Sequence, residues 1–269
     1  MPSRWSDLDR PPLSAVRLNH ALTAGPVWRE IRVVEATGST NADVAEAARS
    51  GAAEGLVVIA EEQRTGRGRL DRQWSSPPRA GVTLSALLRP DVASVRWPLI
   101  PLLAGLSVVA AFDAVAHVEA GLKWPNDVLI GGRKVAGILV ERVADAVVVG
   151  IGINVSTRPE ELPVDTATSL AIEGAATDRE IVVREVLRRL ADRYRDWLDT
   201  AGDPGSILTD YRRRCETIGS PVEVQLPGGA VARGVATRIE DGGGLVVQVD
   251  GCEERTFLAG DVTHVRRVS

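Results

Sequence analysis

The sequence has little of the two residue types on which most nucleophilic catalysis and metal binding depend. It contains three histidines and two cysteines, Cys215 and Cys252, in 269 residues. Two cysteines are too few for a disulfide framework and match no metal-ligand spacing. His20, His117 and His264 all lie outside the motifs described below, so Ser-His-Asp and Cys-His catalysis are not expected.

Long apolar runs and an excess of basic charge are also missing. The most apolar run, 102–112, is far shorter than the roughly 20 residues that cross a bilayer, and residues 1–12 are polar and broken by proline. The net charge of −4 argues against a chain-wide surface for nucleic acid. With 44% hydrophobic residues to fill a core, we expect a soluble, cytoplasmic protein without a membrane or nucleic-acid partner.

Lysine and asparagine are rare. Nearly all basic residues are arginine, and lysine occurs only at Lys123 and Lys134. Asparagine occurs only at Asn19, Asn41, Asn126 and Asn154. Codon bias with chance survivors is one explanation, and a need for a compact point charge is the other. Both lysines and three of the asparagines fall in glycine-rich or turn-rich segments, which favours a functional reason.

The patterns of apolar and turn residues predict two domains. For the first domain, 1–217, strands are expected over 31–35, 56–61, 82–88, 122–130, 134–143 and 146–155. Helices are expected over 13–22, 40–50, 93–118, 178–198 and 206–215. Strand pairs and long helices without a βαβ rhythm favour an α+β domain with a mixed β-sheet flanked by helices.

The second domain, 218–269, has a different character. Short strands are expected over 222–226, 230–239, 245–249 and 256–258, with 262–265 as a fifth, separated by runs of glycine. This pattern predicts a small all-β barrel of roughly fifty residues.

A polar loop over 62–78 follows the second strand and contains Gly66, Arg67, Gly68 and Arg69. Guanidinium groups beside exposed main-chain N–H groups are suited to wrap a phosphate or carboxylate. The loop is neither a P-loop nor a dinucleotide fingerprint. A solvated charged loop is the alternative, but Gln63 before it and an indole after it, at Trp74, favour binding.

Two further segments place charge next to turns. In Lys123-Trp124-Pro125-Asn126-Asp127 a turn ends a strand, and an ion pair closing that turn is the alternative to a binding role. The hairpin that follows returns Lys134 towards the same strand end, so both lysines are expected to face one pocket. Gly137, inside the next strand, is destabilising unless another group approaches the backbone closely.

Small residues mark two other segments. Gly150 and Gly152 lie on one face of a strand that ends at Asn154, which is suited to a flat floor beneath a bound ring, although a bulged strand also explains them. Gly38-Ser39-Thr40-Asn41 supplies hydroxyls and an amide at a helix N-terminus, for capping or for a neutral ligand. Positive charge, main-chain donors and one carboxylate suit phosphoryl or nucleotidyl transfer with magnesium on the phosphates.

These five segments, in this order, resemble the biotin–protein ligase family (biotin–[acetyl-CoA-carboxylase] ligase) in the short form without an N-terminal DNA-binding domain. The matching motifs are GSTN at 38–41, the Q-x-x-GRGR loop at 63–74, KWPND at 123–127, GRKxAGILxE at 132–141 and GxGxN at 150–154. The resemblance spans about residues 31–155. It implies a catalytic domain like those of class II aminoacyl-tRNA synthetases and biotin ligases, with a C-terminal SH3-like barrel.

The resemblance also implies a reaction. Biotin would attack the α-phosphate of ATP, with Mg²⁺ present, to give biotinyl-5′-adenylate. A lysine of a biotin carboxyl carrier protein or an acyl-CoA carboxylase subunit would then take the biotin. By motif, the catalytic residues would be Lys134, Arg67 and Asp127, with Asp127 also placed to orient the amine or hold a metal.

The same motifs imply the ligand contacts. Biotin would be bound by Ser39, Thr40, Asn41, Gln63, Gly66, Arg67, Gly68, Lys134, Gly137 and Gly150. ATP would be bound by Arg69, Trp74, Lys123, Asn126, Lys134, Gly152 and Asn154. One residue departs from the family pattern, because Asp71 replaces the glycine of the loop's second Gly-Arg pair and adds negative charge beside an anion site.

Two alternatives remain at this stage. Lipoate and octanoate ligases share the catalytic architecture but do not need this set of motifs together. The second alternative is a non-catalytic sensor of biotin or a nucleotide, in which Asp71 has abolished catalysis. The presence of Lys134 argues against this alternative. An interaction module would explain only the C-terminal barrel.

Overall fold

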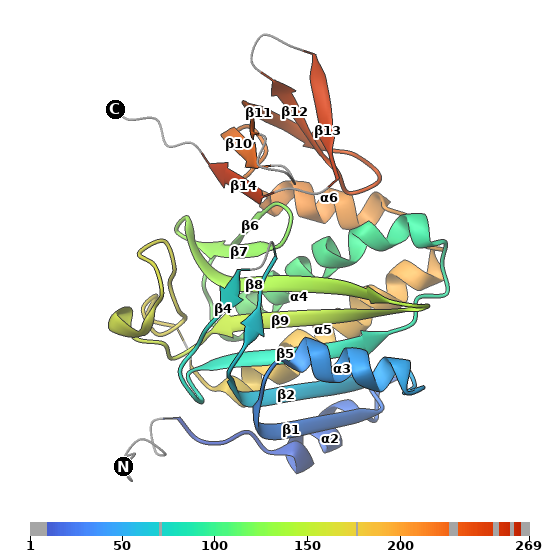
Figure 1. The fold of residues 1–269 in the computed structure, drawn as a ribbon, viewed down its shortest axis with the longest axis vertical. Coiled ribbons are helices and arrows are strands. Elements are labelled where there is room, and N and C mark those ends of the chain that lie inside the picture. Colours follow the sequence, from blue (N-terminus) through green and yellow to red (C-terminus); the bar gives the residue numbers. More distant parts are fainter. Residues whose placement is uncertain are drawn as a thin grey trace.

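The structure, a computed structural model, describes residues 10–69, 72–175, 177–225, 231–249, 253–258 and 261–264. Its larger part is a seven-stranded mixed sheet with helices on both faces (Figure 1). The strand order is β1 (Glu30–Thr37), β2 (Leu56–Gln63), β5 (Gly81–Leu88), β9 (Ala146–Asn154), β8 (Arg133–Val143), β7 (Asp127–Ile130) and β6 (Gly121–Lys123). The strands predicted for this domain are confirmed, and the predicted turn around Pro125 separates β6 from β7.

The first two strands of the sheet, with the helix between them, form a βαβ unit. The sequence-based expectation that the domain contains no βαβ unit is therefore wrong. Strands β1 and β2 pair in parallel, and helix α3 (Thr40–Arg49) makes the crossover between them. All other pairs in this sheet are antiparallel. Ser39 caps α3 by accepting from the main-chain N–H of Ala42, so the predicted capping role of the GSTN segment is confirmed.

The opposite face of the sheet is covered by α2 (Ala15–Leu22), α4 (Ile100–Val115) and α5 (Arg179–Asp199), as Figure 1 shows. The helix predicted over 93–118 is divided, because a 3₁₀ helix, Ser94–Leu99, precedes α4. Pro98 lies inside the 3₁₀ helix, and Pro101 stands in the first turn of α4, where its missing N–H costs no helical hydrogen bond.

The stretch Ser94–Val115 has the length and hydropathy of a membrane span. Two thirds of its most apolar window is nevertheless buried inside the protein, and α4 packs against α5 and the sheet. It is the core helix of this fold.

The C-terminal part is a five-stranded antiparallel sheet, the small SH3-like domain expected from the sequence. Its order is β13 (Glu254–Phe257), β12 (Leu245–Val249), β11 (Val231–Ile239), β10 (Pro221–Gln225) and β14 (Asp261–His264). Helix α6 (Gly205–Arg214) leads into it. Cys215, just after α6, is a buried free thiol, and Cys252 lies outside the described residues.

Hydrogen bonds between described residues join this sheet to the larger domain. The indole Nε1 of Trp124 donates to the carbonyl oxygen of Gly243 at 2.9 Å, and a guanidinium nitrogen of Arg212 donates to that of Ile239 at 2.6 Å. Trp124 is fully buried. The tryptophan of the KWPND segment therefore connects the two sheets.

Candidate active site

The register of the large sheet aligns small residues from four strands in one row. Thr83 on β5 pairs with Gly152 on β9, Gly152 with Gly137 on β8, and Gly137 with Asp127 on β7. Two residues along, Ser85 pairs with Gly150. Because two of the four positions in the first row lack a Cβ, the sheet offers a flat strip there.

A hairpin and a helix end enclose this strip. The hairpin consists of β3 (Gly66–Arg67) and β4 (Gln73–Trp74), and it lies over the face of the sheet that carries α3 (Figure 1). The N-terminal end of α3 borders the same strip. Strip, hairpin and helix end together form one cavity.

Most residues predicted for the site line this cavity. They are Ser39, Thr40, Asn41, Gln63, Arg67, Gly68, Arg69, Trp74, Asn126, Asp127, Lys134, Gly137, Gly150 and Gly152. Sequence reasoning did not select Arg72, Gln73, Thr83, Leu84, Ile138, Leu139 and Ile151, which line it too. A signal existed for Thr83, one of two hydroxyl residues in a strand that is otherwise apolar, but none distinguished the aliphatic residues from ordinary core residues.

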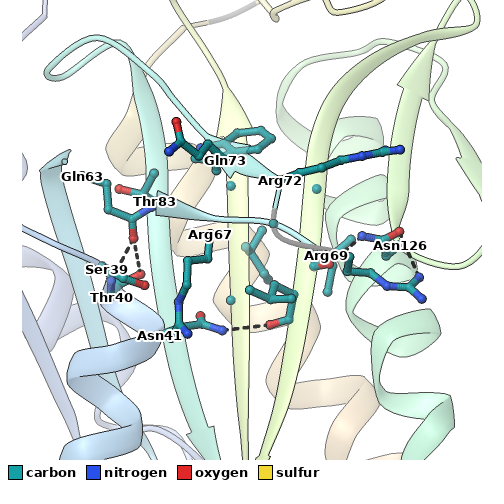
Figure 2. Close-up of a pocket in the computed structure, with 18 of the residues that line it drawn as sticks. Ser39, Thr40, Asn41, Gln63, Arg67, Arg69, Arg72, Gln73, Thr83 and Asn126 are labelled. Carbon is teal, nitrogen blue, oxygen red and sulfur yellow. Dashed lines mark hydrogen bonds between the residues drawn. The ribbon is translucent and has the colours of Figure 1, made fainter. Parts of the chain in front are cut away.

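One side of the cavity carries neutral hydrogen-bonding groups. The Oε1 atom of Gln63 accepts from the main-chain N–H of Thr40 at 2.8 Å and from its hydroxyl at 3.0 Å (Figure 2). The hydroxyl of Ser85, which is fully buried, lies 2.7 Å from that of Thr40 and donates to Oδ1 of Asn41 at 2.6 Å. Ser39 is also buried there. This side is suited to a neutral ligand group rich in donors and acceptors.

The other side carries charge. The ammonium Nζ of Lys134 lies 2.7 Å from Oδ1 of Asp127 and 5.8 Å from the centre of the Trp74 ring. A guanidinium nitrogen of Arg69 donates to Oδ1 of Asn126 at 3.4 Å, and Figure 2 shows this pair across the cavity from the neutral groups. The predicted hairpin geometry that brings Lys134 back to the end of the preceding strand is confirmed.

The strip glycines are required by what lies on them. A Cβ at Gly152 would stand 2.7 Å from Cζ2 and 2.8 Å from Nε1 of Trp74, so only glycine lets the indole lie flat on β9. A Cβ at Gly150 would stand 2.9 Å from the amide carbon of Asn41. The predicted flat floor therefore exists, with the protein's own indole on it, and Gly150 makes room for an amide.

Three predicted residues do not line the cavity. Gly66 faces the carbonyl of Trp74 across the hairpin, and a Cβ there would overlap it. Asn154 is buried, and its amide donates to the carbonyl of Thr168 at 2.9 Å. Lys123 is the cross-strand partner of Asp127 in the β6–β7 pair and so lies on the same face of the sheet, but it is not among the residues that line the cavity. That both lysines face one pocket stays a prediction.

Asp127 does not have the surroundings of a metal ligand. It is the one acidic residue among the described lining residues, and its carboxylate is paired with the Lys134 ammonium. No group of three metal-binding side chains occurs within the described ranges. The donor set therefore does not fit a protein-held Mg²⁺. Asp71, which replaces the glycine of the family pattern in the loop, lies outside the described residues.

Comparison with known proteins adds a family to this geometry. Residues 33–157 match the Biotin/lipoate A/B protein ligase family, and residues 217–265 match the Biotin protein ligase C terminal domain. The chain is 45% identical over 265 residues to the biotin--[acetyl-CoA-carboxylase] ligase of Mycobacterium tuberculosis, covering 96% of this chain and 97% of that protein. The chain belongs to the biotin protein ligase family.

Other members agree with this assignment. The bifunctional ligase/repressor BirA of Bacillus subtilis is 35% identical over 256 residues, which cover 92% of this chain and 78% of that protein. The biotin protein ligase of Aquifex aeolicus in complex with biotin and ATP aligns with a TM-score of 0.73 at 28% identity. That alignment covers 89% of this chain and all of that one. The biotin protein ligase fold thus accounts for both sheets.

Proposed function

We propose that this chain is an ATP-dependent ligase that joins biotin to a lysine of a biotin carboxyl carrier protein or acyl-CoA carboxylase subunit. The observation that carries the proposal is the division of one cavity into a neutral side at Gln63, Thr40 and Asn41 and a cationic side at Lys134 and Arg69. A neutral ring system with an acidic tail is complementary to that division. The relatives named above are ligases of this kind.

In the first step a carboxylate oxygen of biotin forms a bond to the α-phosphorus of ATP, and the bond from that phosphorus to pyrophosphate breaks. Both reactants are anions, so positioning and charge neutralisation supply most of the catalysis. Lys134 is the residue we assign to the meeting point, because its ammonium lies at the strip beside the indole of Trp74. Arg69 and Asn126 would contact the nucleotide.

The β3–β4 hairpin covers the cavity. Arg67 and Gly68 lie on its inner side at the cavity, and we assign them to the carboxylate and phosphates. Enclosure by the hairpin excludes water from the mixed anhydride, which strengthens each electrostatic contact inside and slows hydrolysis. Magnesium is expected to arrive with the phosphates of ATP, since the protein's own acidic residue is already paired with Lys134.

In the second step the amine of the acceptor lysine bonds to the carbonyl carbon of the adenylate, and the bond from that carbon to AMP breaks. The amine loses a proton in forming the amide. We assign Asp127 to orient the incoming amine, because its carboxylate already forms an ion pair with an ammonium group at 2.7 Å. We also infer that the protein acts in the cytoplasm.

The test is ATP–pyrophosphate exchange with biotin, with lipoate and with neither, followed by transfer to a purified carrier domain. Biotin-dependent exchange is expected. Exchange with lipoate alone would overturn the substrate and keep the chemistry. Biotin binding without exchange would instead favour the sensor.

A further inference from the structure

Glu141, on β8, is an acidic residue that touches two of the assigned ligand-binding residues. One oxygen, Oε2, accepts from Nδ2 of Asn41 at 2.6 Å, and the other, Oε1, lies 3.7 Å from Nη2 of Arg67. Asn41 lies in the first turn of α3, and Arg67 lies on the hairpin that covers the cavity. Glu141 therefore links the end of α3, which borders the strip, to the hairpin that covers the cavity.

The neighbours of Asn41 determine which way its amide points. The carboxylate of Glu141 and the main-chain carbonyl of Leu139 are both acceptors, and both lie on the same side of the amide, at 2.6 and 3.2 Å. Only the NH₂ group can face two acceptors. The carbonyl oxygen, Oδ1, must then face Ser85, which donates to it.

This arrangement uses both N–H bonds of Asn41 within the protein. Its oxygen accepts one hydrogen bond from Ser85 and retains a second lone pair. Asn41 is 4% exposed, so its amide has little room to exchange one orientation for another at low cost. An amide held in this way meets a ligand as an acceptor and never as a donor.

From this geometry we infer that Glu141 is a positioning residue, which fixes the Asn41 amide as an acceptor and draws Arg67 over the site. The inference rests on the proposed function, since it concerns how biotin is recognised there. Of its two contacts, the one to Asn41 is the shorter and the more buried, so it carries the larger effect.

The experiment compares Glu141→Leu and Glu141→Gln in biotin-dependent exchange and in direct titration of biotin. Leucine removes both contacts. Glutamine keeps an acceptor for Asn41 and loses the charge facing Arg67. Losing a hydrogen bond to a charged group predicts a rise of about 10-fold or more in KM for biotin with Glu141→Leu, and a smaller rise with Glu141→Gln. KM for ATP is expected to rise less than KM for biotin in both, because only the weaker contact of Glu141, that to Arg67, concerns the phosphates.

A double-mutant cycle separates positioning from general structure. With Asn41→Ala as the background, Glu141→Leu is expected to add little to the loss of biotin affinity, because the group it orients is gone. Glu62→Gln is the matched control. It breaks a carboxylate–guanidinium contact of the same 3.7 Å, to Arg64, outside the cavity, and is expected to change neither KM.

Three results would overturn the inference: an unchanged KM for biotin in Glu141→Leu, an equal loss in both backgrounds, or an equal rise in KM for ATP. If Glu141→Leu does not fold, Glu141→Gln in the same cycle decides. Failure of the wild-type protein to exchange would refute the proposed function instead. The biotin titrations would still test Glu141 in that event.

Discussion

Substitution of Lys134 by alanine removes the ammonium group from the cavity and leaves its backbone in place. The main-chain N–H of Lys134 donates to the carbonyl of Thr166, and its carbonyl accepts from the N–H of Thr168, both at 2.8 Å. Neither bond involves the side chain. The Lys134 side chain is 36% exposed, so loss of its pair with Asp127 is expected to cost about 1 kcal/mol of folding free energy or less.

The effect on chemistry should be much larger. Removing a single neutral donor from a site that stabilises developing negative charge lowers kcat by about 10²–10³. Lys134 supplies a full positive charge between two anionic reactants in the proposed first step. We therefore expect Lys134→Ala to lower biotin-dependent pyrophosphate exchange by at least about 100-fold. Thermal unfolding should change little.

Lys134→Arg tests whether the shape of the cation matters. A Cβ on Gly137 would stand 3.1 Å from both Cε and Nζ of Lys134, so the lysine side chain lies closely against the strip. The planar, longer guanidinium does not fit this position without displacing the hairpin, and exchange is expected to stay impaired. Arg49→Ala, which removes a positive charge from the exposed end of α3, is the control. Near wild-type exchange by a folded Lys134→Ala protein would refute the reasoning.

Three further changes test other parts of the structure. Gly152→Ala places a methyl group under the indole of Trp74, and should raise KM for ATP without unfolding the protein. Trp124→Phe removes the hydrogen bond to Gly243 and should lower the unfolding free energy by about 1 kcal/mol, measured in urea. Partial desolvation raises the pKa of the Glu216 carboxyl above its ordinary 4.5, although the residue is exposed, so a small part of the stability is lost as the pH rises through this range. Glu216→Gln should therefore raise Tm at neutral pH, with no gain at about pH 4.

Each change has a control or a contrary result. Gly242→Ala, at a turn with open space and no positive φ, is the control for Gly152→Ala and is expected to change neither stability nor KM. An unchanged KM for ATP in Gly152→Ala would show that the indole does not have to lie flat. Equal unfolding midpoints for Trp124→Phe and wild type would remove Trp124 as the link between the sheets. A Tm gain for Glu216→Gln that is the same at both pH values would exclude ionisation as the cause.

Local sequence determined much of this protein. The capping serine before α3, the prolines at the start of α4 and the glycines between C-terminal strands each act on the backbone within a few residues of themselves, so their consequences could be predicted. The five motifs in order predicted the family, and the family comparison confirmed it. One local prediction failed because β1 and β2, parallel neighbours, are joined by a helix that the strand pattern did not reveal as a crossover.

The tertiary structure decided which of the motif residues meet. Gly137 and Gly152 form one strip because β8 and β9 pair in a particular register. The separate β6–β7 pairing places Lys123 one strand beyond Asp127, and Lys123 is not among the residues that line the cavity. The contact of Trp124 with Gly243 and that of Glu141 with Asn41 join segments about a hundred residues apart in the chain. Such contacts depend on packing between whole elements, which short-range sequence pattern does not encode.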